Sequence, residues 1–152
     1  MSSFWRHLFN VQYRLLAWFD PAIRAMWRRG GIGNILELRV ARRDGRGERR
    51  RLLGLLHAGE GFYLGHPNGD AGWTRDLEAA GGATFRYPNG AEWHFSAVRL
   101  APGAERERAI RSTGQHPFPG NLTYWLGRGH VRRFGVFFRL ESAALTSEPA
   151  SL

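Results

Sequence analysis

The sequence contains neither cysteine nor lysine, and each absence excludes a set of chemistries. Without cysteine the chain cannot form disulfides, thiolate metal sites or a cysteine nucleophile. Without lysine it cannot form a Schiff base or use the lysine of a phosphate-binding P-loop. All 22 of its basic residues are therefore arginine. Several large enzyme classes are excluded by composition alone.

Long apolar segments are also missing. No run approaches the roughly 18–20 residues needed to cross a bilayer. The apolar N-terminal stretch is interrupted by Arg6 and Arg14, unlike that of a signal peptide. The absence of cysteine is compatible with a reducing compartment. We therefore expect a cytoplasmic protein.

Short motifs for metal binding, hydrolysis and dinucleotide binding do not occur. The six histidines never form HxH or HExxH, so no metal site is predicted. The GxSxG motif of many hydrolases and the GxGxxG motif of dinucleotide-binding folds are absent as well. The chemistry of this chain must therefore come from other features.

A large excess of arginine is the most distinctive property that remains, and the net charge is +9. Guanidinium groups bind phosphate and carboxylate at two points. The charge suits a phosphorylated cofactor, an anionic lipid surface or nucleic acid. A general preference for arginine over lysine in the source genome would give the same composition. Nucleic acid is not favoured, because no recognised binding module is visible and most aromatic residues lie in apolar stretches.

The chain is predicted to form one domain over residues 1–141, mainly β with flanking helices, followed by a disordered tail over 142–152. Helices are expected within 3–29, ending at two glycines, and a barrel over 34–141. No β-α-β alternation appears, so a small six-stranded antiparallel barrel fits best. Its strands, mostly joined as hairpins, are predicted over 34–43, 50–57, 62–66, 83–87, 91–100 and 132–141.

Apolar residues recur at helical spacing near the N-terminus, at Phe4, Leu8, Val11, Leu15 and Trp18. Such a stripe usually covers the neighbouring core, and we expect it to close one side of the barrel. The basic, tryptophan-rich character of this region would also suit a helix that lies on a membrane surface. Both interpretations stay open.

Eight of the eleven residues in the predicted turn ARRDGRGERRR (41–51) are charged. Arg42 and Arg43 lead into the turn, where Gly45 lets backbone amides point outward. Amides and guanidinium groups together could bind a phosphate. A solvated hairpin tip is the simpler explanation.

Two later loops carry further candidate residues. Gly72 belongs to a pliant loop, and Trp73 opens a predicted helix whose first amides could receive an anion, with Asp76 one turn further. In the loop over 115–130, Phe118 leads into Tyr124 and Trp125, which could form an aromatic wall for a flat substrate. All four aromatic residues could equally belong to the core.

Together these segments resemble the deazaflavin-dependent nitroreductase family, which is related to FMN-binding split β-barrel proteins. The family's GR(K)SG-like turn is similar to Arg42-Arg43-Asp44-Gly45, and its G-W-x-x-N-L segment is similar to residues 72–77. The resemblance covers residues 25–100. It implies a six-stranded antiparallel split β-barrel with an N-terminal helix.

The resemblance also implies a cofactor, the reduced deazaflavin coenzyme F-420, with FMN as the alternative. It implies that a phosphate tail meets Arg42, Arg43 and Gly45, and that Gly72, Trp73 and Asp76 form the cofactor loop. The flat ring would face the second strand at Leu53, Gly54 and Leu55. Asp44 replaces the usual serine and Asp76 the usual asparagine, and both changes put cofactor binding in doubt.

The expected reaction is hydride transfer from the cofactor to a quinone, nitroaromatic or similar conjugated acceptor. Tyr124 is the candidate donor of a hydrogen bond or proton to the acceptor, and Phe118 and Trp125 are the expected pocket walls. One alternative is a split barrel that binds FMN or haem. The other is a non-catalytic basic module that binds anionic lipid or nucleic acid. The sequence leaves monomer and homodimer open.

Overall fold

The computed structural model describes residues 2–142, which form one seven-stranded antiparallel sheet and six α-helices. The strands are β1 (Ile35–Ala41), β2 (Glu48–Gly54), β3 (Leu56–Ala58), β4 (Gly61–His66), β5 (Gly82–Arg86), β6 (Glu92–Arg99) and β7 (Val136–Ser142). The helices are α1 (Ser2–Trp18), α2 (Asp20–Gly30), α3 (Gly72–Ala80), α4 (Ala104–Arg111), the 3-10 turn η1 (Ser112–Gln115), α5 (Gly120–Leu126) and α6 (Arg128–Phe134).

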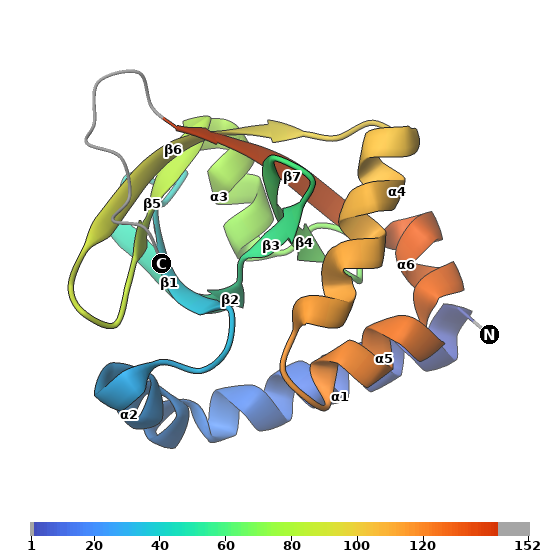
Figure 1. The fold of residues 1–152 in the computed structure, drawn as a ribbon, viewed down its shortest axis with the longest axis horizontal. Helices are drawn as coiled ribbons and strands as arrows, with labels where there is room; N and C mark the ends of the chain where they lie inside the picture. Colours follow the sequence, from blue (N-terminus) through green and yellow to red (C-terminus); the bar gives the residue numbers. More distant parts are fainter. Residues whose placement is uncertain (1, 143–152) are drawn as a thin grey trace.

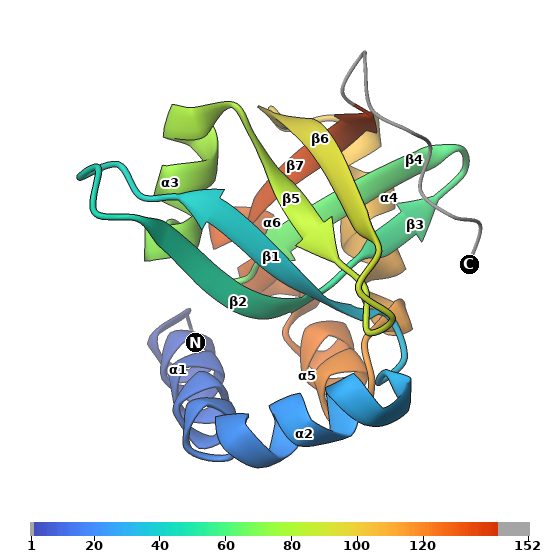
Figure 2. The same cartoon turned by 90° about the vertical axis from the view of Figure 1, so that its left-hand side faces the viewer.

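The sheet curls into a half-barrel because its two edge strands are consecutive in the chain (Figures 1 and 2). The strand order is β2-β1-β5-β6-β7-β4-β3, and only Leu55 separates β2 from β3. Asn34 holds this junction, since its backbone oxygen accepts from the Leu55 amide at 2.9 Å and its side-chain amide donates to the Leu55 carbonyl. The chain thus passes directly from one edge of the sheet to the other.

The predicted split barrel is confirmed at the level of the fold, with two corrections to its strands. Six strands were expected, but the segment over 50–57 contains two, because the chain leaves β1 after Gly54 and pairs with β4 from Leu56. The last strand begins at Val136 rather than at 132, because α6 extends the preceding helical segment. The predicted tail lies outside the described residues except for Ser142, which belongs to β7.

Alternating residues of the strands fill the concave side of the sheet. Leu38, Phe85, Trp93 and Phe138 are buried there, and Leu77 of α3 closes the space. This alternation is the expected pattern of a strand with one face in the core. A second cluster lies on the other side of β3, β4 and β7, where α1, α4, α5 and α6 pack against it.

The expectation that the apolar stripe of the first helix closes one side of the barrel is wrong. The inward face of α1 contains the half-buried Trp5 and the fully buried Phe9, whereas the predicted stripe faces outward, with Phe4 60% and Trp18 80% exposed. The helix carries two apolar faces, and the sequence pattern emphasised the wrong one. Among residues 2–142 no helix is long and apolar enough to span a bilayer.

Candidate functional site at the first hairpin

The hairpin between β1 and β2 presents guanidinium groups, while several of its amides are bonded within the turn. The Gly45 amide donates to the Arg42 carbonyl at 3.1 Å, and the Arg42 amide donates to the Gly47 carbonyl at 2.9 Å. The Asp44 carboxylate accepts from the Arg46 amide at 2.9 Å. The turn needs glycine because Gly45 has a φ of 74°. These three amides are therefore not open to a phosphate, unlike the prediction.

Asp76 is the centre of the site. Its side chain is almost fully buried, and its two oxygens accept from Arg43 Nε and Arg49 Nε, both at 2.7 Å. The Arg43 amide adds a third contact at 3.3 Å. Burial alone would raise the pKa of this carboxyl, but the hydrogen bonds from Arg49 and Arg43 outweigh it and hold the pKa below its usual value. Asp76 therefore carries a stable negative charge that orients two arginines.

The hydrogen bond between Arg49 and Asp76 also explains why residue 72 is a glycine. A Cβ on Gly72 would lie 2.9 Å from the Arg49 guanidinium carbon, which is closer than side chains normally approach. Gly72 thus leaves room for Arg49 to reach Asp76. Trp73 is buried in the main core and contacts Phe138, with ring centroids 6.3 Å apart. Arg43, Gly72 and Asp76 lie close together, whereas Trp73 packs inside the half-barrel.

Arg49 and Arg51 were missed as individual site residues, although both lie on the concave side of the sheet. Arg49 is paired with Val40 and Arg51 with Leu38, and those two partners point into the core. Because side chains alternate along a strand, the inward position of Leu53 could have identified both arginines. Within the described chain Arg51 and Arg42 form no ion pair, and burial together with the neighbouring Arg49 charge lowers the pKa of Arg51. The arginine group, defined here as Arg42, Arg43, Arg49 and Arg51, therefore keeps two cations without a carboxylate partner among residues 2–142.

The far end of β2 is covered by His116. A Cβ on Gly54 would overlap the His116 ring, so the flat group that approaches Gly54 in this structure is an imidazole. Burial lowers the pKa of His116 to about 4, so the ring is neutral at physiological pH. Leu55 is buried in the main core, and Leu53 is half-buried beside it. Of the three predicted ring contacts, only Leu53 lies next to Arg51 on the concave face.

The aromatic residues of the 115–130 loop do not converge on one pocket. Tyr124 is buried between Phe9 and His116, at centroid distances of 5.5 and 5.0 Å. Burial raises its pKa well above the usual value, so its hydroxyl stays protonated. Phe118 and Trp125 instead face outward, with 76% and 61% of their surfaces exposed.

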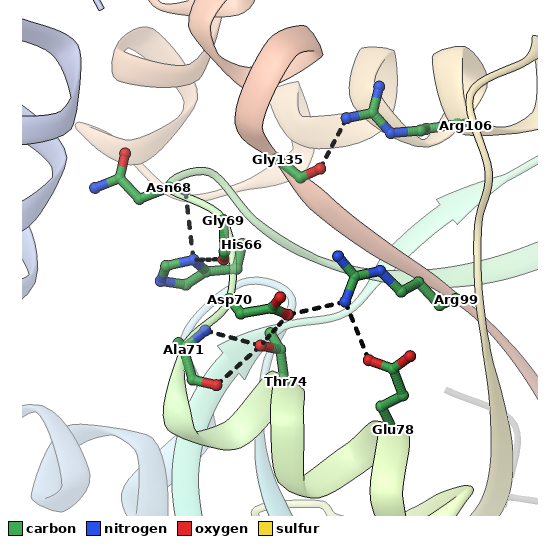
Figure 3. Close-up of polar contacts among 10 residues, drawn as sticks. All are labelled: His66, Asn68, Gly69, Asp70, Ala71, Thr74, Glu78, Arg99, Arg106 and Gly135. Atoms are coloured by element: carbon green, nitrogen blue, oxygen red, sulfur yellow. Dashed lines mark hydrogen bonds and ion pairs between the residues drawn. The ribbon is translucent and has the colours of Figure 1, made fainter. Parts of the chain in front are cut away.

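A second group of arginines lies near the start of α3, beyond the loop over 66–71 (Figure 3). Arg99 donates to Asp70 at 2.9 Å and to Glu78 at 3.0 Å. The buried Arg106 donates to the Gly135 carbonyl at 2.7 Å and so caps the end of α6. A hollow of about 420 Å³ lies between these two side chains, with further lining from Arg132 and Arg133.

The second group of arginines is a poorer candidate for anion binding than the hairpin, because its side chains mostly bind other groups of the protein. Arg99 already has two carboxylate partners, and Arg132 has Glu107 at 3.1 Å. The start of α3 is also capped from within, since Thr74 Oγ1 accepts from the Ala71 amide at 2.8 Å (Figure 3). No group of His, Asp and Glu residues within 2–142 is arranged to hold a metal ion.

Comparisons with known proteins support the fold. Neither the protein-family models nor the curated protein sequences match this chain. Among solved structures, HutZ, the haem storage protein of Vibrio cholerae, is 16% identical with a TM-score of 0.54, over 82% of this chain and 90% of that one. A "putative 5-nitroimidazole antibiotic resistance protein" of Bacteroides thetaiotaomicron is 7% identical with a TM-score of 0.53, over 80% and 78%.

A third similar structure is a "Putative Pyridoxamine 5'-phosphate oxidase" of Listeria innocua. It is 13% identical with a TM-score of 0.50, over 82% of this chain and 93% of that one. At such low identity the likeness concerns the fold alone. The half-barrel with its N-terminal helices is therefore a split-barrel-like fold.

Proposed function

We propose that this chain is an oxidoreductase that binds a flavin-type cofactor with an anionic tail, most specifically the deazaflavin coenzyme F-420, with FMN as the alternative. Arg42 and Arg51 bind the tail, and Asp76 fixes Arg43 and Arg49 beside them. The reduced cofactor supplies the hydride, and the acceptor is a quinone, a nitroaromatic or a similar conjugated compound. The protein contributes binding, orientation and exclusion of water.

The observation that carries this proposal is the unequal pairing within the arginine group. Asp76 offers one negative charge to Arg43 and Arg49, while Arg42 and Arg51 have no carboxylate partner within residues 2–142. Neighbouring guanidinium groups that repel one another favour an anion between them. Phosphate matches them because the planar fork can donate two hydrogen bonds to its oxygens.

The site fits the anionic tail of the cofactor better than it fits the flat ring. The ring position against Gly54 that the family resemblance implies is filled by His116, so a flat ring has only the Leu53 side of β2 available beside Arg51. Tyr124 keeps its proton but lies behind His116 and Phe9. We therefore assign Tyr124 to packing rather than to proton donation. Phe118 and Trp125 are not used in this function.

The similar structures give limited additional support. Their names refer to an oxidase, a haem storage protein and resistance to a nitroaromatic antibiotic. One name thus refers to an oxidation, one to haem and one to a nitro compound. Transfer of that chemistry to this chain is part of the proposal.

The test is titration of the purified protein with F-420, FMN and haem, followed by absorbance and fluorescence. We expect F-420 to bind, and the Arg42→Ala/Arg51→Ala double variant to lose at least about tenfold in affinity, as for the loss of charge-assisted hydrogen bonds. Arg108→Ala/Arg111→Ala is the charge-matched control, because both arginines are exposed on α4 and distant in sequence from the hairpin. Far-UV circular dichroism should show that both variants are folded.

Three results would overturn parts of the proposal. Equal F-420 affinity in the double variant and the control would remove the site. Tight binding of FMN or haem without binding of F-420 would replace the cofactor. Binding of F-420 without reduction of menadione or a nitroaromatic would remove the reaction.

A further inference from the structure

Exposed apolar side chains are concentrated at the helical end of the molecule. Twelve large apolar side chains of the described residues are exposed. Seven lie on α1, α2 and the turn between them, four lie within 118–126, and only Val98 lies elsewhere. Single exposed apolar residues need no explanation, but a concentration of this kind marks an interaction surface.

Helix α1 has three distinct faces. Trp5 and Phe9 point toward the second core cluster. Phe4, Leu8, Leu15 and Trp18 follow one another at helical spacing, and all four are exposed. The remaining face is polar and includes the exposed His7 and Arg14. Residues 2–19 contain no acidic side chain. The helix thus presents an unused apolar stripe beside a basic face.

Helix α5 runs antiparallel to α1 and extends this surface. Gly120 lies near Gln12, the Tyr124 ring is 5.5 Å from that of Phe9, and a Cβ on Gly127 would be 2.9 Å from the Trp5 ring. Both helices lie at the same end of the molecule, away from the open hairpin of β1 and β2 (Figures 1 and 2). We call the eleven exposed apolar residues here the helical apolar surface: Phe4, Leu8, Leu15, Leu16, Trp18, Phe19, Met26, Phe118, Leu122, Trp125 and Leu126.

The charge around this surface distinguishes its possible partners. Arg14, Arg28 and Arg29 are exposed, and no ion pair holds them within the described residues. Asp20 is the single acidic residue before Glu37, and it is paired with Arg24 at 2.7 Å. Residues 108–140 contain no acidic side chain either. A second copy of the chain would bring the same positive charges against these, which disfavours self-association through this surface.

We propose that the helical apolar surface is a docking surface for an anionic lipid bilayer. The aromatic and aliphatic side chains enter the boundary between headgroups and acyl chains, and the neighbouring arginines contact the anionic headgroups. The helices lie in the plane of the interface and do not cross the bilayer. This inference is independent of the cofactor proposed above, because the side chains that would enter the bilayer are not those that would bind the cofactor. It would bring the protein to the phase in which apolar conjugated compounds dissolve.

The test is co-sedimentation with vesicles of phosphatidylcholine alone and with vesicles that contain phosphatidylglycerol. We expect binding to the anionic vesicles that weakens as salt is added. The Leu15→Ser/Trp18→Ser/Trp125→Ser variant should bind at least tenfold more weakly, since all three side chains are exposed and their removal should leave the fold intact. Val98→Ser is the control for position, because Val98 is the large exposed apolar residue of the described chain that lies outside this surface.

A charge variant separates the two contributions. Arg14→Gln/Arg28→Gln/Arg29→Gln should lose the preference for anionic vesicles, whereas Arg111→Gln should keep it. Equal binding of the apolar variant and wild type, or no binding of wild type to either vesicle, would overturn the proposal. A wild-type dimer in sedimentation equilibrium that the apolar variant converts to monomer would identify a second copy as the partner instead.

Discussion

At the Glu48 end of β2 two arginines meet a buried carboxylate, whereas at the Gly54 end the strand is covered by a neutral imidazole ring. The first contact is electrostatic and joins β2 to α3 through Asp76. The second is a close steric fit between a residue without a side chain and His116 of the loop after η1. The same edge strand is thus held by charge at one end and by shape at the other.

The difference shows how an arginine-rich edge strand can remain ordered. Neighbouring guanidinium groups repel, so β2 needs a negative charge close to Arg49. At Gly54 no charge is present, and contact with an uncharged ring is sufficient. Arg51 lies between the two contacts, with β1 on one side and no second neighbouring strand. Its backbone is fixed at both ends, while its guanidinium group keeps no carboxylate partner within residues 2–142.

Loss of the Asp76 charge should have the largest effect on the charged end. Asp76→Asn leaves Arg43 and Arg49 without their shared carboxylate, and we expect the free energy of unfolding to fall by about 3 kcal/mol. The lower part of the usual range applies because Arg43 is 45% exposed. Urea unfolding at pH 7 measures this loss. Asp44→Asn is the control, since Asp44 is exposed and accepts one amide hydrogen bond.

The sign of the pH dependence follows from the lowered pKa of Asp76. The unfolded carboxyl titrates near pH 3.9. The stabilisation is therefore present above about pH 4 and is lost as the pH falls toward the lower folded value. A wild-type protein and an Asp76→Asn variant of equal stability at pH 7 would contradict this account of the charged end.

The neutral end should give a pH dependence in a different range. The pKa of His116 is about 4 in the folded protein, against about 6.5 when unfolded. The unfolded state binds the proton first, so stability falls as the pH decreases from 6.5 to 4, by about 3 kcal/mol at most. His116→Phe should remove this part of the slope. His66 and His130 also have lowered pKa values, so the readout is the difference between variant and wild type. Parallel stability curves would show that His116 is not buried as a neutral ring.

Much of the fold was predictable because its elements follow simple periodic patterns. The end of α2 at two glycines, the hairpin after β5 and the helix near Trp73 agree with the expected segments. The break at Leu55 was not predictable, because Leu52 to Leu56 reads as one apolar run. Only the pairing of Gly54 with Ile35 and of Leu56 with Tyr63 divides it.

The sequence allowed several residues of the candidate site to be predicted, but not the contacts between them. The family resemblance put Arg43 and Asp76 in one site, and the two are hydrogen-bonded. It gave no indication that Asp76 binds the arginines of the chain itself. The cover over Gly54 comes from His116, which is 62 residues later in the sequence. The orientation of α1 was ambiguous for a physical reason, since a helix with two apolar faces can bury either one.

Gly54→Ala tests the steric end with a smaller expected effect, about 2 kcal/mol for a methyl group forced into a packed site. The new Cβ would overlap the His116 ring, and the Asn34 side-chain amide would be 3.0 Å away. In the His116→Ala background most of this cost should disappear, because the space is then open. Urea unfolding of the four proteins gives the coupling energy directly. An equal cost of Gly54→Ala in both backgrounds would mean that another neighbour excludes the side chain, and the contrast between the two ends of β2 would then lose its steric half.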